Sequence, residues 1–416
     1  MWRRGMGAIR RGFRGVSTAV RRHLEDEGDW SFSPEWWEPD SAGLTVFRQL
    51  SGHGNGVVSV VAHPSSRPDS DQWPAIERWL QQRYVQIHPE SDPCVQLRIL
   101  GYQWRVLHFN DNTRQSTAKV LTAFRKSDPG SLYLMQQPHC LAVPYLKSLL
   151  SVGLATLASV GFDIMGAVSG SKLMRILCIG HGGGSLPLFL ASKFQGAIIH
   201  IVEIDPVVVS ASMQAMGFPA CEVKDISGES FILTDSPNQE LWQGIQDRLC
   251  LYISDAEGFI LDNENVYDLV FVDAYDGDDI FPHKLWDPDG PFLKSLGNRV
   301  HPDHGTVVVN LHADSDILAA ETDHSHFENI LPMGKYVSQV CRAYKKHLGL
   351  AYKVSVPWLC NISLVACRRG DRRVAPSLDR NSLLNALIAN SHLVEFVLGL
   401  PFPCVQYIKR GFALID

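Results

Sequence analysis

A glycine-rich segment is the first feature of the sequence that could do chemistry. Gly180, Gly182 and Gly184 form a GxGxG pattern directly after a short apolar run and before a helical pattern. Glycines allow a tight turn and let a ligand approach the backbone closely. The free N–H groups at the start of the following helix suit an anionic group such as a carboxylate. The segment therefore predicts a binding site for part of a small ligand.

An acidic residue ends each of the next three apolar runs along the chain. These residues are Glu203, Asp255 and Asp273. If the runs are parallel strands, their carboxyl ends meet at the edge of the sheet where ligands bind. There Glu203 can accept hydrogen bonds from two ribose hydroxyls and Asp255 from an adenine amino group, while Asp273 lies where the reacting group should sit. The alternative is a tight turn with ordinary surface acids.

The glycine segment also separates the classes of nucleotide ligand. No GxxxxGK[ST] segment occurs, so the loop is not a P-loop. A dinucleotide-binding loop favours a third glycine where Ser185 stands, which makes NAD the weaker option. The pattern favours S-adenosylmethionine, which is already an activated electrophile. An enzyme using it needs to align a nucleophile and keep it unprotonated.

The elements around these residues predict an α/β fold. Short apolar strands alternate with helices after residue 172, which is typical of a doubly wound, mostly parallel, Rossmann-like sheet. Residues 43–135 predict a small β-rich N-terminal module with one amphipathic helix at 73–84 and a hairpin across Gly101 and Tyr102. We expect the Rossmann-like domain to span 138–370 and a helical extension to span 377–416.

Composition excludes several classes of protein. The 416 residues are 45% hydrophobic and 20% charged, as in globular proteins, and the net charge of -6 does not favour a nucleic-acid partner. Nine cysteines without a CxxC pair predict reduced thiols and no zinc site. No membrane span is expected. Residues 1–24 hold seven arginines and no acid, which predicts a mitochondrial or plastid presequence. The alternative is a basic tail on a cytoplasmic protein.

Four segments together resemble a known superfamily. They are CIGHGGGSLPLFL at 178–190, VEIDP at 202–206, SDA at 254–256 and YDLVFVDAYD at 267–276. These resemble the spermidine-synthase-like branch of the class I S-adenosylmethionine-dependent methyltransferases, and within it the carboxyl-terminal half of the elongation factor 1-alpha lysine and N-terminal methyltransferases. The resemblance covers roughly residues 95–370. It implies the class I methyltransferase fold and S-adenosylmethionine as cofactor, or its decarboxylated form in an aminopropyltransferase.

The resemblance also implies roles for individual residues on the cofactor side. The three glycines of the GxGxG segment would line the methionine part, Glu203 would hold the ribose, and Asp255 with Ala256 would meet the adenine. Gln115 matches a cofactor-contacting glutamine of the β module. No residue is expected to bind a metal.

On the acceptor side, Asp273 and Asp276 match two aspartates that bind and deprotonate the attacking amine in a synthase. Tyr275 stands between them, and its ring could line a slot for a cationic group. The alternative for Tyr275 is plain packing. The neighbouring acids Asp278 and Asp279 extend the cluster, which would suit a basic amine or a lysyl or N-terminal amine of a protein.

Two departures bear on the reaction. Residues 137–146 lack the Tyr-Gln-Glu segment of polyamine synthases, and residues 116–120 lack the acids that usually follow the glutamine. A polycation needs paired carboxylates to offset its desolvation. We therefore expect methyl transfer to an amine of a protein or small molecule, with aminopropyl transfer in polyamine biosynthesis as the alternative. A catalytically silent scaffold is the third hypothesis. Synthases of this branch pair through their β modules, so a homodimer is expected.

Overall fold

The computed structural model describes residues 43–64, 73–87, 89, 96–110, 113–224, 230–231, 245–277, 280–313, 335–357, 360–368 and 379–415. The arginine-rich segment at 1–24 lies outside these residues, as do Asp278 and Asp279 of the acidic cluster.

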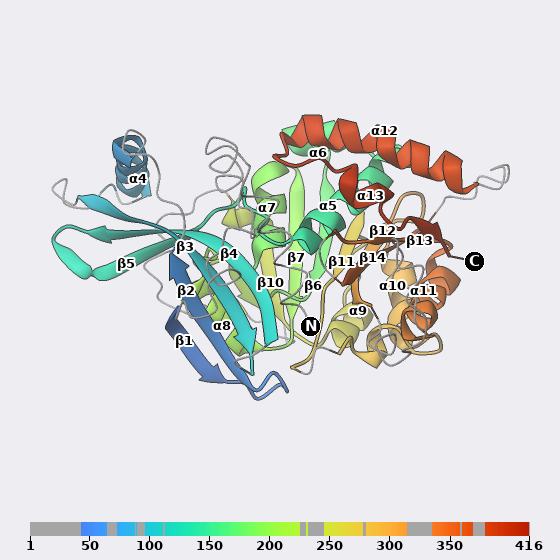
Figure 1. Ribbon diagram of the computed structural model, residues 1–416, viewed down its shortest axis with the longest axis horizontal. Coiled ribbons are helices and arrows are strands. Elements are labelled where there is room, and N and C mark those ends of the chain that lie inside the picture. The colour runs from blue at the N-terminus through green and yellow to red at the C-terminus, as the bar shows by residue number, and fades with distance from the viewer. Residues whose placement is uncertain are drawn as a thin grey trace, which may run out of the picture.

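Five antiparallel strands form a separate N-terminal sheet (Figure 1). They follow one another in the order β1 (Leu44–Leu50), β2 (Val57–Pro64), β3 (Leu97–Phe109), β4 (Thr113–Arg125) and β5 (Asp128–Gln136). Helix α4 (Trp73–Ile87) connects β2 to β3 and buries Leu80 and Tyr84 against one face of the sheet. The predicted β module with one amphipathic helix is therefore present.

The predicted hairpin across Gly101 and Tyr102 is wrong, because both residues lie inside the single strand β3. The pairing register between β3 and β4 shifts between Ile99 and Gly101, which marks a β-bulge. A bulge adds a residue without reversing the chain, and glycine is common there. The chain reverses after Asn110, whose φ of 50° is the one positive non-glycine φ among the described residues.

A ten-stranded mixed sheet forms the larger part of the molecule, in the order β15-β13-β14-β12-β11-β6-β7-β10-β8-β9. Its strands are β6 (Met174–Ile179), β7 (Ala197–Glu203), β8 (Glu222–Lys224), β9 (Ser230–Phe231), β10 (Leu249–Ile253), β11 (Leu269–Val272), β12 (Thr306–His312), β13 (Leu350–Ser355), β14 (Asn361–Cys367) and β15 (Ala413–Leu414). Strands β10, β7, β6, β11 and β12 run parallel, and β14 lies antiparallel between β12 and β13. The chain passes from β6 to β7 on one side and returns to β11 on the other. This doubly wound order confirms the predicted Rossmann-like fold class.

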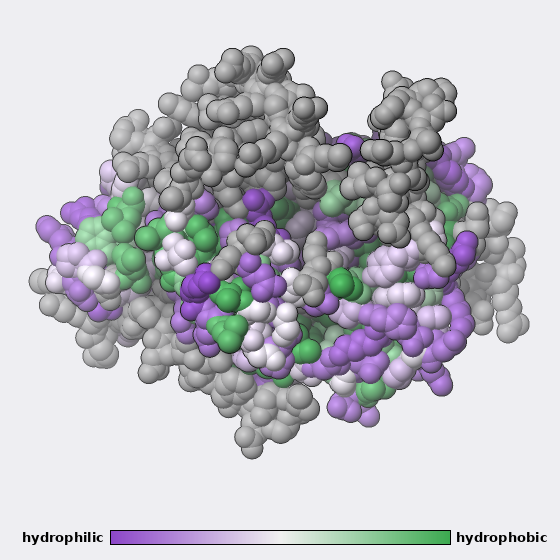
Figure 2. Space-filling view, turned by 60° about the horizontal axis from the view of Figure 1, so that its bottom comes forward, coloured by the Kyte–Doolittle hydropathy of each residue, from purple (hydrophilic) through white to green (hydrophobic). Residues whose placement is uncertain are grey.

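Helices cover both faces of this sheet, and two 3-10 turns lie in its connections. One face carries α5 (Pro144–Ser159), α6 (Ile164–Ser169), α7 (Ser185–Lys193), α12 (Arg380–Leu398) and α13 (Gln406–Lys409). The other face carries α9 (Ala256–Asp262), α10 (Pro291–Arg299) and α11 (Lys335–Leu348), and the 3-10 turns are η3 (Gln246–Arg248) and η4 (His283–Leu285). Along α11, Val337, Cys341 and Tyr344 recur at helical spacing and are buried. Figure 2 shows the face at the bottom of Figure 1, where hydrophilic residues predominate toward the side of α10 and α11.

The end of the chain adds to the sheet, since β15 pairs with β13 where the sequence predicted a helical extension. Among the helices that the structure describes, none is both long and apolar enough to cross a bilayer.

Helix α8 (Pro206–Ala215) joins the two sheets. Its buried residues Val208 and Ala211 belong to the same apolar cluster as Val60 and Leu107 of the N-terminal sheet. The buried guanidinium of Arg105 in β3 donates through Nη1 to the carbonyl oxygen of Ala215 at 2.8 Å, which caps the end of α8. The N-terminal sheet is therefore packed on α8, which covers the larger sheet after β7.

Truncating Leu107 to alanine tests this interface. Leu107 is fully buried, so Leu107→Ala is expected to lower the free energy of unfolding by about 2–5 kcal/mol through lost burial and a residual cavity. Leu44 in β1 is 71% exposed, and Leu44→Ala should change it by no more than about 0.5 kcal/mol. Denaturant unfolding of both variants measures the difference, and equal effects would contradict the packing described.

Candidate functional site

A pocket of about 1230 Å³, including its open mouth, lies at the carboxyl ends of β6, β7, β10 and β11. Every site residue predicted from the sequence lines it except Gly184. The lining members of that set are Gln115, Gly180, Gly182, Glu203, Asp255, Ala256, Asp273, Tyr275 and Asp276. The structure thus brings together acids and glycines that are far apart in the chain.

The glycine segment turns sharply between β6 and α7. Gly180 has a φ of 89°, and a Cβ there would stand 2.0 Å from the carbonyl oxygen of Asp273. No side chain fits in that space. Gly184 has a φ of 75° at the N-cap of α7, and its missing Cβ would collide with the ring of Phe218 at 2.3 Å. Gly184 therefore allows the start of α7 to pack against Phe218, whereas Gly180 and Gly182 line the pocket.

Glu203 is buried at the end of β7 and fixed by the backbone. Its Oε2 accepts the N–H of His181 and its Oε1 accepts the N–H of Asp205, each at 3.0 Å. Burial raises the pKa of Glu203 to about 6, against the effect of these hydrogen bonds. Each carboxylate oxygen has a second acceptor position. The side chain can therefore accept two further hydrogen bonds from a ligand in the pocket.

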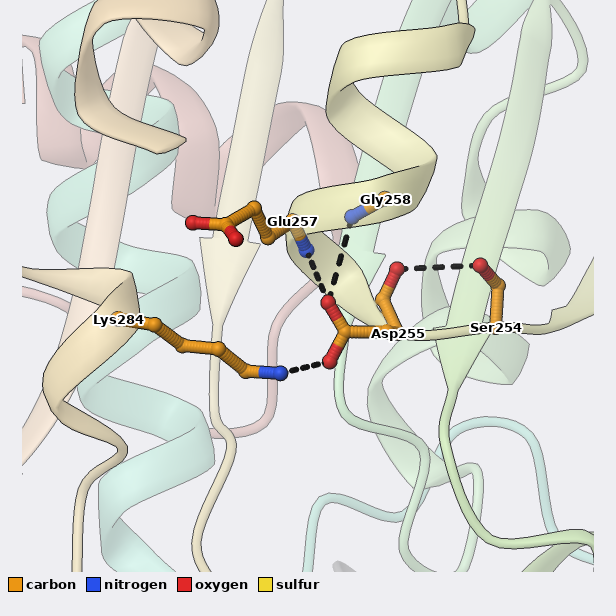
Figure 3. Close-up of polar contacts among 5 residues, drawn as sticks. All are labelled: Ser254, Asp255, Glu257, Gly258 and Lys284. Carbon is orange, nitrogen blue, oxygen red and sulfur yellow. Dashed lines mark hydrogen bonds and ion pairs between the residues drawn. The ribbon is translucent and has the colours of Figure 1, made fainter. Parts of the chain in front are cut away.

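The carboxylate of Asp255 has three protein partners in addition to its place in the pocket (Figure 3). Its Oδ1 accepts the N–H groups of Glu257 and Gly258 at 3.0 and 3.3 Å and so caps α9. Its Oδ2 forms an ion pair with Nζ of Lys284 in η4. Partial burial acts to raise the pKa of Asp255, but the hydrogen bonds from Lys284 and the helix N–H groups outweigh it and hold the pKa below its usual value. The sequence did not indicate this role for Lys284.

Asp273 is oriented by residues that the sequence did not single out. Nδ2 of Asn310 in β12 donates to its Oδ1 at 2.8 Å, and Nδ2 of Asn361 in β14 donates to Oδ1 of Asn310 at 3.0 Å. The phenol of Tyr145, in the first turn of α5, also hydrogen-bonds Asp273. Burial, and then the charge of Asp273, raise the pKa of Tyr145 well above its usual value. The phenol therefore stays protonated and donates to the carboxylate.

Tyr275 and Asp276 follow Asp273 along the pocket wall. The Tyr275 hydroxyl donates to the carbonyl oxygen of Asn310 at 2.8 Å, and its ring stacks on His312 with centroids 4.5 Å apart. Tyr275 therefore packs against its neighbours and also lines the pocket. Asp276 is partly exposed, and its Oδ1 accepts the N–H of Ile280 at 2.8 Å.

Gln115 presents a buried donor on the wall of the pocket. Its Nε2 is buried without a hydrogen-bond partner on the wall of the pocket. Buried polar atoms in native proteins are nearly always satisfied, so an orphaned donor in a pocket indicates an acceptor on a ligand. The identification of Gln115 as a ligand-contacting residue therefore gains a physical reason from its position.

The loop between β1 and β2 closes one side of the pocket, which the sequence did not predict. His53 and Asn55 of this loop line the pocket. Nδ2 of Asn55 and Oγ of Ser51 both donate to Oδ2 of Asp205, at 2.7 and 2.6 Å. Asp205 also caps α8 by accepting the N–H of Val207. One carboxylate therefore joins the N-terminal sheet to the start of the helix after β7.

The charges around the pocket are mostly negative. Glu203, Asp255, Asp273 and Asp276 line it, and among the described lining residues Lys284 is the one lysine or arginine. The thiol of Cys178 also lines the pocket, and burial together with the charge of Asp273 raises its pKa strongly. Within the described residues, no group of three or more His, Cys, Asp or Glu side chains is placed to hold a metal ion. The pocket suits a ligand or substrate that carries positive charge.

Comparison of sequences finds one short similarity. No family model matches the chain. A stretch of 45 residues is 47% identical to the eEF1A lysine and N-terminal methyltransferase of Bos taurus. This stretch is 11% of the present chain and 6% of the length of that relative.

Solved structures that resemble the chain at low identity include the following three. Human methyltransferase-like protein 13 in complex with SAH is 19% identical over 62% of this chain and 93% of its own, with a TM-score of 0.43. A probable spermidine synthase from Corynebacterium glutamicum ATCC 13032 is 15% identical over 70% and 85%, with a TM-score of 0.39. A spermidine synthase in complex with the transition state analogue AdoDATO is 12% identical over 74% and 90%, with a TM-score of 0.36. The predicted resemblance to the eEF1A lysine and N-terminal methyltransferase is confirmed over the 45 matched residues. The roles of individual residues rest on the geometry above.

A methyl group added at Gly180 tests the turn. Gly180→Ala places Cβ against the Asp273 carbonyl oxygen in a left-handed conformation, and it is expected to lower the free energy of unfolding by about 1–3 kcal/mol. Gly258 in α9 has nothing within 4 Å of its missing Cβ. Gly258→Ala should therefore be neutral or stabilise by up to about 1 kcal/mol. Thermal and denaturant unfolding of both variants measures these changes. If Gly180→Ala left the free energy of unfolding unchanged, the close approach would be disproved.

Proposed function

We propose that the chain is an S-adenosylmethionine-dependent methyltransferase that acts on an amine of a protein or small molecule. The observation that carries the proposal is one pocket that contains a buried carboxylate suited to ribose and, beside it, a carboxylate suited to an amine. Glu203 supplies the first and Asp273 the second. Gly180 connects the two parts of the pocket. It begins the turn after β6, and its backbone lies close to the carbonyl oxygen of Asp273.

The residues present fit the cofactor at three points. The two oxygens of Glu203 can accept the ribose hydroxyls while they keep their backbone partners. The orphaned Nε2 of Gln115 needs an acceptor, which the carboxylate of the methionine part would supply. Asp255, next to Ala256, keeps an acceptor position on Oδ2 for the adenine amino group. The negative pocket also suits the positive charge of a sulfonium.

In the reaction, the protein's own residues would prepare the amine. When bound, the cofactor supplies an activated methyl group. Asp276, which is partly exposed, attracts a cationic amine, and the Tyr275 ring lines the same side of the pocket. Asp273 then accepts a proton from the ammonium, which frees the nitrogen lone pair for attack. Asn310 and Tyr145 hold Asp273 in one orientation, so little reorganisation is needed at that step.

Aminopropyl transfer remains the second candidate, because the same two aspartates would also receive a polyamine. The test is a calorimetric titration of the full chain with S-adenosylmethionine and, separately, with its decarboxylated form. Selective binding of the carboxylated form is expected, because its carboxylate would accept a hydrogen bond from Nε2 of Gln115 and the decarboxylated form has no such acceptor. Selective binding of the decarboxylated form would replace this proposal by aminopropyl transfer. Binding of neither to the folded chain would favour a silent scaffold.

The pH dependence of cofactor binding tests the role of Glu203. With a pKa of about 6, Glu203 is ionised above pH 7, and protonation on acidification removes acceptor positions for the ribose. We expect affinity for S-adenosylhomocysteine to be constant from pH 7 to 8 and to fall up to about tenfold per pH unit below 6. Calorimetry of the wild type and of Glu203→Gln, which should bind about tenfold or more weakly and lose this step, measures the effect.

Protonation of Glu203 would not itself unfold the chain, so a loss of affinity at acid pH could not be attributed to unfolding caused by this residue. Its pKa is higher in the folded than in the unfolded chain, so the folded state binds the proton more tightly. The contribution of this residue to stability therefore rises as the pH falls from above 6 toward its unfolded value. Affinity and stability should thus move in opposite directions at this residue. An affinity that is independent of pH in the wild type would contradict the assigned role.

A further inference from the structure

We propose that Lys284 is a positioning residue that couples occupation of the adenine end of the pocket to the segment that lines the acceptor end. The inference rests on the proposed function, since it takes the ligand of the pocket to be an adenine nucleoside. The chemistry that Lys284 recognises is the carboxylate of Asp255, which faces that ligand. Its side chain is a donor in a pocket whose other charged lining groups are acids.

The ion pair leaves room for the ligand. Oδ1 of Asp255 is used by the two N–H groups at the start of α9, whereas Oδ2 has Lys284 as its partner (Figure 3). A carboxylate oxygen has two acceptor positions. Oδ2 can therefore accept an adenine amino group and keep the ammonium group of Lys284. Binding of the nucleoside does not require the ion pair to break.

Lys284 connects two parts of the site that follow different strands of the sheet. Asp255 follows β10, whereas Lys284 lies in η4, at the end of the connection that begins after β11 with Asp273. This connection carries Tyr275 and Asp276, which line the acceptor side. On its outer side it is anchored to α11, because the Tyr344 hydroxyl donates to the carbonyl oxygen of Leu285 at 2.9 Å. The ion pair is thus a link from this connection to the adenine end.

The strength of that link depends on what fills the pocket. The side chains of Lys284 and Asp255 are 45% and 32% exposed, and ion pairs at such exposure contribute little. A nucleoside seated against Asp255 excludes water from one side of the pair and lowers the local dielectric constant, which strengthens the attraction. By thermodynamic reciprocity, the pair then strengthens nucleoside binding. An occupied adenine end would therefore hold the acceptor side of the pocket more firmly.

The test uses Lys284→Met, which keeps the length of the side chain and removes its charge, and Lys284→Arg, which keeps the charge. Lys346→Met is a matched control, because Lys346 forms an exposed ion pair with Asp289 at 3.1 Å outside the pocket. S-adenosylhomocysteine is titrated into each full-length variant at low and high salt. Amide hydrogen exchange is followed with and without the ligand in two segments, residues 254–260 and residues 280–287.

In the wild type, the ligand should slow exchange in both segments. In Lys284→Met it should bind about twofold to fivefold more weakly, with a smaller salt dependence, and still protect 254–260 while the gain at 280–287 is lost. Lys284→Arg should restore that gain, and Lys346→Met should match the wild type. If the ligand binds but Lys284→Met keeps full protection at 280–287, the coupling is disproved and the proposed function stands. If the wild type binds no S-adenosylhomocysteine, both are disproved.

Discussion

The contact between the ends of β6 and β11 is the constraint on which the site depends. The backbone of Gly180 lies so close to the carbonyl of Asp273 that no side chain fits between them. Because β6 and β11 are neighbours in the sheet, the turn after one and the acid after the other share a single space. Backbone geometry thereby places the glycine turn and the Asp273 carboxylate side by side, before any side chain is oriented.

Side chains from other elements then fix what the backbone brings together. Asn310 and Asn361 come from β12 and β14, and Tyr145 comes from α5, yet all three act on Asp273 directly or in sequence. Such a chain of hydrogen bonds orients a carboxylate in a partly buried site before a ligand arrives, so the site needs little reorganisation afterwards. The N-terminal sheet contributes in the same way through Asn55, which reaches Asp205 beside Glu203. The pocket is therefore a product of both sheets.

Periodicity and strand-end chemistry made the fold and much of the site predictable. Alternating strands and helices indicated the doubly wound sheet, and an acid after each strand indicated Glu203, Asp255 and Asp273. The same reasoning misread Gly101 as a turn, because a glycine in a strand pattern signals a bulge as well as a turn. Local patterns also could not reveal Lys284, which meets its partner only through tertiary packing. Asn310 was equally hidden, since a polar residue within an apolar run shows no partner in the sequence.

The buried thiol of Cys178 has a consequence for any alkylating ligand held in this pocket. A sulfonium would find a cysteine at the wall of its own binding site. Thiolates, not thiols, are the reactive form, and both burial and the negative charge of Asp273 keep this sulfur protonated. The same carboxylate that would draw a proton from the amine thus holds one on the cysteine. An enzyme of this kind would be protected by its own electrostatics from modifying itself.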